Sequence, residues 1–203
     1  MRISPIAQRL ASITVLLFVL LTGCQSAMSS SGNTTPPPGH GPYTGTVTDW
    51  PLRFIAHNFG VQCFDTQSCE ILYRGFLHRS DEPRPSVESY GRPLEKLLTA
   101  GRGPIPNFPP PANVTWRSKD GSSHHAEIDI GEIFKDKLIR HNVAREDISE
   151  SSYVPTPHIV LEVNDRTINV YMQAMIYLKK PRFADRPNSD YRDDLIKVFS
   201  RTY

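Results

Sequence analysis

The stretch Thr167-Ile168-Asn169-Val170-Tyr171-Met172-Gln173-Ala174-Met175-Ile176-Tyr177-Leu178 gives the clearest strand signal in the chain. Every second residue from Ile168 to Leu178 is apolar, which predicts a β-strand with that side buried. The run Ile159-Val160-Leu161-Glu162-Val163 precedes it across the short link Asn164-Asp165-Arg166. Two such runs joined by a turn predict an antiparallel hairpin, so the fold is expected to be built on a sheet.

Other strand signals lie on either side of this hairpin. Asp120-Gly121 is a strong hairpin turn, with Val114 and Trp116 sharing a face before it and Ala126 and Ile128 sharing one after it. The runs 52–59 and 69–76 are short and rich in β-prone residues, and they flank two cysteines. The sequence therefore predicts several antiparallel hairpins.

Helical spacing is expected in three places. A short helix follows Pro93 and ends at Gly101, and a second begins at Ile130 and ends near Asn142. A third is expected over 189–199, with Ser189 as its N-cap and an apolar stripe made of Tyr191, Leu195, Val198 and Phe199. Hairpins with occasional helices and no internal repeat predict an α+β single domain.

The segment 103–111 contains five prolines and fits neither a regular helix nor a central strand. It is expected to form a stiff surface loop. Ile105 and Phe108 would then be exposed apolar side chains without an obvious core.

The first residues have the build of an export signal. Arg2 and Arg9 precede or flank an apolar run that continues to Leu21, and small residues follow. Leu21-Thr22-Gly23-Cys24 resembles a bacterial lipobox, which implies cleavage before Cys24 and attachment of acyl chains, palmitate among them, to that cysteine. Several acyl chains hold a protein on a membrane where one does not. The alternative is an unmodified signal peptide that ends near a cysteine.

Composition sets the expected domain boundaries. Residues 1–23 form the signal peptide, residues 24–49 form a lipidated flexible tether rich in Ser, Gly and Pro, and residues 50–203 form the α+β domain. Gln25 follows Cys24 where an aspartate would, by resemblance to Gram-negative lipoproteins, favour the inner membrane. The expected location is the periplasmic face of the outer membrane.

Charge argues against a nucleic-acid partner. The 203 residues include 23 Lys+Arg and 21 Asp+Glu, and loss of Arg2 and Arg9 with the leader leaves 21 of each sign. Neither half of the mature chain is basic, so no electrostatic footprint for nucleic acid is present.

With Cys24 committed to lipid, Cys63 and Cys69 form an even pair in an oxidising compartment. The flanking runs read as strands, so a disulfide across a hairpin turn is expected, and a loop this short contributes roughly 2 kcal/mol. A redox-active or metal-binding pair is the alternative, but such sites usually have two residues between the cysteines.

The chain lacks the common catalytic motifs. It has no Gly-x-Ser-x-Gly elbow, no His-Glu-x-x-His and no phosphate-binding glycine loop. His124 and His125 are adjacent, so on a strand they point to opposite faces, and a zinc site would need His57, His78 or His158 to converge from separate strands. The expectation is a non-enzymatic binding protein with no cofactor and no metal.

Three stretches carry a family resemblance. They are Phe54-x-x-His57-x-Phe59-Gly60-x-x-Cys63-Phe64-Asp65-Thr66-x-x-Cys69, Trp116-Arg117-Ser118-x-Asp120-Gly121 and the run from Leu161 to Met172. With them the chain resembles proteobacterial lipoproteins similar to the immunity proteins of type VI secretion effectors, especially lipase or phospholipase effectors. The resemblance implies a periplasmic inhibitor that covers the active site of an incoming toxin, and it assigns no contact residues.

An inhibitory interface needs apolar anchors within a polar rim. Ile105 and Phe108 on the proline-rich segment, or Tyr171, Met175 and Tyr177 on the second face of the 167–178 strand, are the candidate partner-binding residues. The three strand residues are more simply explained by packing under a helix, whereas the pattern does not decide for Ile105 and Phe108. Other functions left open are an envelope structural or assembly lipoprotein, which contacts membrane or peptidoglycan components, and a lipid-anchored hydrolase.

Overall fold

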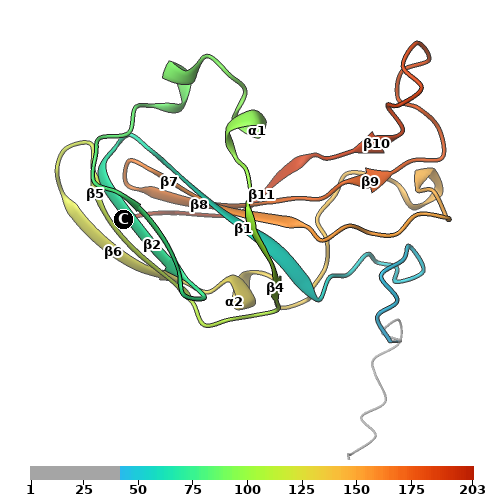
Figure 1. The fold of residues 1–203 in the computed structure, drawn as a ribbon, viewed down its shortest axis with the longest axis horizontal. Coiled ribbons are helices and arrows are strands. Elements are labelled where there is room, and N and C mark those ends of the chain that lie inside the picture. The colour runs from blue at the N-terminus through green and yellow to red at the C-terminus, as the bar shows by residue number, and fades with distance from the viewer. Residues whose placement is uncertain (1–41) are drawn as a thin grey trace, which may run out of the picture. The chain divides into compact units, whose positions relative to one another are not determined.

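The computed structural model describes residues 42–203, and strands dominate this part of the chain (Figure 1). The expected signal peptide, Cys24 and most of the expected tether lie outside the described residues. Each helix has four residues or fewer. The elements are β1 (Ala56–Phe64), β2 (Thr66–Tyr73), β3 (Phe76–Ser80), η1 (Val87–Tyr90), α1 (Leu94–Leu97), β4 (Arg102–Pro106), β5 (Ala112–Ser118), β6 (Ser123–Ile128), α2 (Ile130–Ile133), η2 (Arg145–Asp147), β7 (His158–Asn164), β8 (Thr167–Gln173), β9 (Ile176–Tyr177), β10 (Tyr191–Arg192) and β11 (Leu195–Thr202).

The strands of residues 42–203 form three sheets. A five-stranded sheet has the order β11-β8-β7-β1-β4, a four-stranded sheet has the order β3-β2-β5-β6, and β10 pairs with β9 alone. All pairs are antiparallel except β1 with β7. The predicted hairpins β5–β6 and β7–β8 are confirmed, the second with Asn164 opposite Thr167.

The main core lies between the five-stranded and four-stranded sheets. Alternate residues of β7 and β8 face it, as the pleat of a strand requires. From the other sheet, Val114, Trp116, Ala126 and Ile128 face it, as the sequence predicts. The largest buried side chains here include Trp116, Tyr73, Phe54, Phe134, Ile71, Ile105 and Ile159.

A smaller core lies on the opposite face of the five-stranded sheet. There Phe64, Val160 and Tyr171 are buried together with Leu98, and Val87, Leu94, Leu97, Ala100 and Leu195 pack against them. The segment 86–100, with η1 and α1, is therefore the cover of this face. Gly60 of β1 allows the backbone of the cover to approach the sheet closely, because a Cβ at this position would overlap the Thr99 carbonyl.

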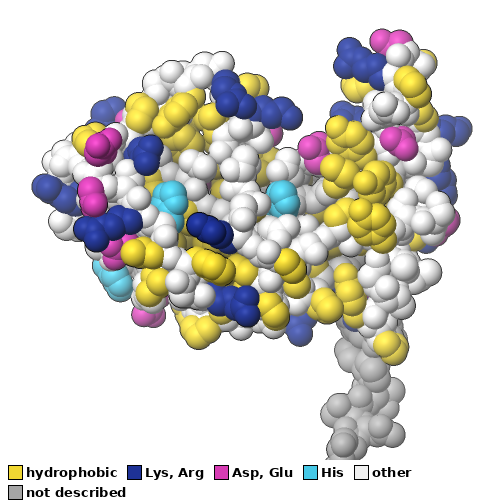
Figure 2. Space-filling view, viewed as in Figure 1, with side chains coloured by type: hydrophobic (Ala, Val, Ile, Leu, Met, Phe, Trp, Pro, Cys, Tyr) yellow, Lys and Arg dark blue, Asp and Glu magenta, His cyan; other side chains and the backbone are white. Residues whose placement is uncertain are grey.

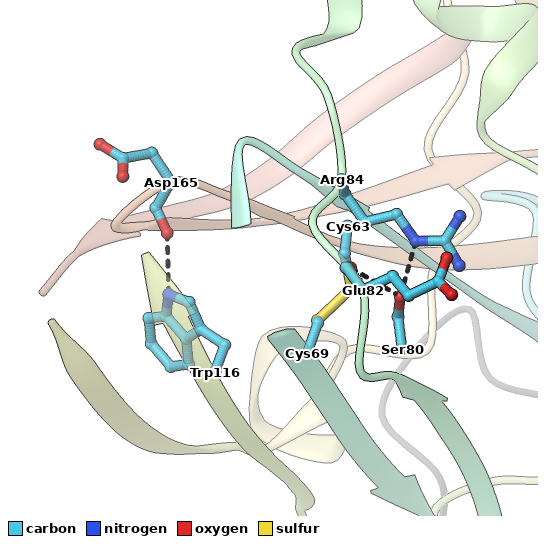
Figure 3. Close-up of a disulfide and its surroundings, with 7 residues drawn as sticks. All are labelled: Cys63, Cys69, Ser80, Glu82, Arg84, Trp116 and Asp165. Carbon is cyan, nitrogen blue, oxygen red and sulfur yellow. Dashed lines mark hydrogen bonds between the residues drawn. A yellow bond between two sulfur atoms is a disulfide. The ribbon is translucent and has the colours of Figure 1, made fainter. Parts of the chain in front are cut away.

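The predicted disulfide between Cys63 and Cys69 is present, with a Cα–Cα distance of 6.6 Å. The expected hairpin around it is wrong. The chain turns at Asp65, which has a positive φ of 48°, and passes from the five-stranded sheet to the four-stranded sheet. The disulfide therefore links the two sheets (Figure 3).

Near this disulfide, hydrogen bonds also connect the two sheets. The Trp116 indole Nε1 donates to the Asp165 carbonyl at 2.8 Å (Figure 3), and the Lys119 amide donates to an Asp165 carboxylate oxygen at 3.0 Å. The turn between β5 and β6 is thus attached to the turn between β7 and β8. In Figure 3 the Trp116–Asp165 bond and the disulfide lie between strands of both sheets.

The predicted helix over 189–199 is wrong, because this segment forms β10 and β11. β11 pairs with β8, and the register shifts between Lys197 and Phe199. Because of this irregularity, the neighbours Val198 and Phe199 both pack against the main core. The alternation of a regular strand is lost, and the apolar spacing imitates a helix.

The prediction of a surface loop for the segment 103–111 is wrong for its first part. Its first part is β4, an edge strand that pairs with β1, with Ile105 opposite His57. Pro104 and Pro106 fit there because an edge strand has one side without ladder partners.

Two further elements are shorter than expected. The helix beginning at Ile130 ends at Ile133, and Lys137 with φ of 56° lies outside helical geometry. The long strand beginning at Thr167 is interrupted after Gln173, and Ile176–Tyr177 forms β9 in a separate sheet. The packed region begins before the expected boundary at Trp50, since Val47 is buried in the main core.

Candidate binding surface

Two of the expected partner-binding residues are in or against the main core. Ile105 is fully buried, so its expected exposure is wrong. Phe108 is half-buried and packs against the core, with its ring centroid 5.8 Å from that of Phe54 and 5.7 Å from that of His57. Ile105 is buried because it lies in the edge strand β4, which pairs with β1 instead of looping into solvent.

Tyr171 is buried as well, under the cover of residues 86–100. Its hydroxyl donates a hydrogen bond to the Glu162 carboxylate at 2.9 Å. Burial raises the pKa of Tyr171, and the Glu162 charge adds to the effect. The interpretation as a packed residue therefore holds, and Tyr171 offers no surface to a partner.

Met175 and Tyr177 lie together on the surface. They line a groove of about 380 Å³, whose other lining residues are Tyr153, Pro155, Thr156, His158, Gln173 and Asp193. Met175 is 37% exposed. The Tyr153 and Tyr177 ring centroids are 6.3 Å apart. Apolar and aromatic side chains thus line one groove together with several polar groups.

Tyr153 is the residue that sequence reasoning missed. It is 65% exposed, the largest exposed fraction among the large hydrophobic residues of the described chain. The signal was an aromatic residue in the proline-rich stretch Tyr153-Val154-Pro155-Thr156-Pro157. Its position is set by the β-bridge to Thr46 and by the Val154 amide, which donates to the Gly45 carbonyl at 3.0 Å.

The lining of the groove includes one imidazole, His158, one aliphatic hydroxyl, Thr156, and one carboxylate, Asp193. Burial lowers the pKa of His158, which favours the neutral ring at neutral pH. In the structure of residues 42–203, no hydrogen bond joins these three side chains. They are the polar lining residues beside Met175 and Tyr177.

The groove lies at the base of a feature that we call the arm, residues 175–194. The chain leaves β8, runs out through β9, turns, and returns through β10 to β11 (Figure 1). Figure 2 shows hydrophobic side chains gathered over the β9–β10 side of the molecule, with Lys and Arg near the end of the arm. Residues 179–188 are all exposed.

A buried polar cluster lies away from this surface, in the main core. His57 is fully buried, and its Nδ1 is 2.8 Å from the Asn107 amide oxygen while its Nε2 is 3.1 Å from the Tyr73 hydroxyl. Burial lowers the pKa of His57 and raises that of Tyr73. The Asn107 amide nitrogen donates to the Phe54 carbonyl, so the cluster attaches the end of β4 to the core.

Among residues 42–203, no group of three or more His, Cys, Asp or Glu side chains is arranged to hold a metal ion. No helix in the same residues is long and apolar enough to cross a membrane. Searches of protein-family models, of curated proteins and of solved structures found no match to this chain.

Proposed function

We propose that the domain binds and inhibits another protein through the groove at the base of the arm. The observation that carries this proposal is the group Tyr153, Met175 and Tyr177, which is exposed or half-exposed and lines one groove. Aromatic residues and Met are enriched in protein interfaces, where a few anchors contribute most of the binding energy. Thr156, His158 and Asp193 supply the polar rim that such anchors need.

The N-terminal sequence supports a cellular location for the proposed inhibitor. The lipobox-like residues 21–24 support acylation of Cys24, and Gln25 supports the periplasmic face of the outer membrane. An inhibitor held there meets a toxin at the place where a lipid-degrading enzyme would act. The family resemblance supports the same conclusion, namely a non-enzymatic immunity lipoprotein directed against a type VI secretion (phospho)lipase effector.

The test uses the chain from Gln25 onward as bait, because this part contains every residue of the described domain. The bait is used to capture partners from the producing cell, and the lipase activity of the captured partner is measured against increasing bait. The expected result is one partner with phospholipase activity that the bait abolishes. Capture of envelope-assembly proteins alone would favour a structural lipoprotein and contradict the inhibitor.

A matched pair of variants places the interface. Tyr153→Ala with Met175→Ala removes two groove anchors, and truncation of such hot spots costs about 2 kcal/mol or more, roughly a 30-fold loss of affinity. The control is Phe76→Ala with Leu77→Ala on β3, whose side chains are exposed to a similar degree. Equal inhibition by the two variants would place the interface elsewhere.

A further inference from the structure

The end of the arm carries an unusual combination of side chains. Phe183 is 45% exposed, and the guanidinium groups of Arg182 and Arg186 lie 5.4 Å and 5.1 Å from its ring centroid. A partly exposed apolar ring therefore lies in contact with two cations. Lys179 and Lys180 precede it, and Asp185 is the one carboxylate between residues 179 and 188.

Two of these four cations have a carboxylate nearby. The Lys179 Nζ donates to the Glu146 carbonyl at 2.6 Å and lies 3.8 Å from the Glu150 carboxylate, and Arg186 is 3.8 Å from its neighbour Asp185. Within the described residues, Lys180 and Arg182 have no carboxylate within ion-pair distance. Beside them lies a hollow of about 640 Å³, whose charged lining residues are Lys179, Lys180, Arg182 and Arg192 together with the acidic Glu146 and Asp147.

The turn that carries Phe183 is held in one shape by Ser189. The Ser189 hydroxyl donates to the Arg186 carbonyl at 2.6 Å, and the Phe183 amide donates to that hydroxyl at 3.1 Å. The backbone of Ser189 adds two bonds, accepting from the Arg182 amide and donating to the Arg186 carbonyl. The ring and the cations are thus fixed on an internally hydrogen-bonded turn.

We propose that the end of the arm, residues 179–188, binds the surface of an anionic phospholipid bilayer. Arg and Lys pair with headgroup phosphates, and an aromatic ring between them enters the boundary between headgroups and acyl chains. Arg and aromatic residues are common at protein interfaces too, but Lys is depleted from them. A protein partner therefore fits less well, because the end of the arm offers two lysines and one apolar anchor among its cations.

The position of the arm agrees with this occupant. The described chain enters the fold through Thr46, which bridges to Tyr153, and the Tyr153 ring contacts Tyr177 of β9. The chain therefore enters beside the base of the arm. A lipid on Cys24, which is part of the proposed function, keeps this end of the domain near the bilayer.

The test is vesicle co-sedimentation of the chain from Gln25 onward, which has no lipid of its own, in the absence of any effector. The vesicles are phosphatidylcholine alone or equimolar phosphatidylcholine and phosphatidylglycerol. We expect binding to the anionic vesicles and much weaker binding to the neutral ones. Added salt should weaken it, while inorganic phosphate at constant ionic strength should leave it in place.

Two arm variants and one control make the result specific. Arg182→Gln with Arg186→Gln should lower the partition coefficient on the order of 30-fold, and Phe183→Ser should lower it by a smaller factor. The control, Arg74→Gln with Lys96→Gln, removes the same charge from exposed positions outside the arm and should retain binding.

Three outcomes would overturn the membrane proposal. They are absence of binding to anionic vesicles, equal loss in the arm variant and the control, and arm variants that bind vesicles normally but no longer capture the effector. The last result would assign the arm to the protein interface. Because inhibition is read from effector activity and membrane binding is read without effector, either proposal can fail while the other stands.

Discussion

One face of the five-stranded sheet meets the four-stranded sheet, whereas the other meets the cover of residues 86–100. On the first face, Leu161 and Val170 pack into an apolar layer contributed by regular strands. On the second face, the same two strands place a carboxylate, Glu162, which is 2% exposed. Tyr171 and Asn169 donate to one of its oxygens, and Asn164 donates to the other at 3.3 Å.

The difference shows what each face demands of its neighbours. The apolar face requires close packing against rigid strands. Because these strands cannot move into a cavity, removing atoms from this face lowers stability strongly. The polar face requires that every buried hydrogen-bonding atom be paired, since an unpaired one is costly. Ser200 of β11 extends the network by donating to Asn169 at 2.7 Å, so the second face depends on hydrogen bonds as well as on volume.

The largest expected effect comes from Leu161→Ala on the apolar face. We expect a loss of about 4 kcal/mol in the free energy of unfolding, measured by urea denaturation, because two rigid sheets cannot close the cavity. Leu98→Ala in the cover should cost about 2 kcal/mol, because a segment with one-turn helices can collapse onto the gap. A larger loss for Leu98→Ala would reverse the comparison.

The second effect concerns the link between the sheets. Replacing both Cys63 and Cys69 with serine should lower the free energy of unfolding by roughly 2 kcal/mol and leave the circular dichroism spectrum unchanged. Reduction of the unmodified protein should give the same loss. An unchanged melting temperature in the double variant would show that the hydrogen bonds around Asp165 hold the sheets together by themselves.

The third effect tests the polar face. Tyr171→Phe removes one donor from the buried Glu162 carboxylate and should cost about 1.5 kcal/mol, again measured by urea denaturation. The matched control is Tyr90→Phe, since Tyr90 is 40% exposed. If the two variants are equally stable, the carboxylate does not depend on the Tyr171 hydroxyl.

The smallest effect is a dependence on pH. Burial lowers the pKa of His57 in the folded chain, so below about pH 6.5 the unfolded chain binds the proton more readily. The free energy of unfolding therefore decreases as the pH is lowered. A proton taken up only by the unfolded chain contributes at most about 1.4 kcal/mol per pH unit.

Urea denaturation midpoints between pH 8 and pH 5 measure this dependence. The loss of stability should begin as the pH falls below the His pKa of the unfolded chain. His57→Gln should flatten the curve without abolishing the slope, because the pKa values of His78, His141 and His158 are also lowered by burial. An unchanged slope in the variant would mean that His57 does not contribute.

The parts of the fold that the sequence predicts well are those with local partners. The hairpins β5–β6 and β7–β8 each join neighbouring strands through a short turn, so alternation and turn residues suffice. The parallel pairing of β1 with β7 and the pairing of β11 with β8 join distant parts of the chain. No local pattern carries that information, and the irregularity at Lys197–Phe199 hides β11 behind a helical spacing.

The candidate surface was predictable in part for the same reason. Met175 and Tyr177 follow the point where the β8 pattern leaves the sheet, and the structure places them in one groove. Tyr171 belongs to the same alternation but lies where the cover packs, and the cover comes from a distant segment. Ile105 was misplaced because its neighbouring prolines suit an edge strand as well as a loop.

The parallel pair has a consequence for the order of folding. Asn58 lies opposite His158, so β1 has no lasting partner on that side until the second half of the chain is present. Sheets that depend on contacts between distant parts of the chain form slowly. Until the pairing is complete, the unpaired strand edge can associate with other chains and aggregate. If the chain crosses a membrane N-terminus first, as expected for an export signal at residues 1–23, β1 emerges long before β7. A holding chaperone in the receiving compartment would then protect this edge.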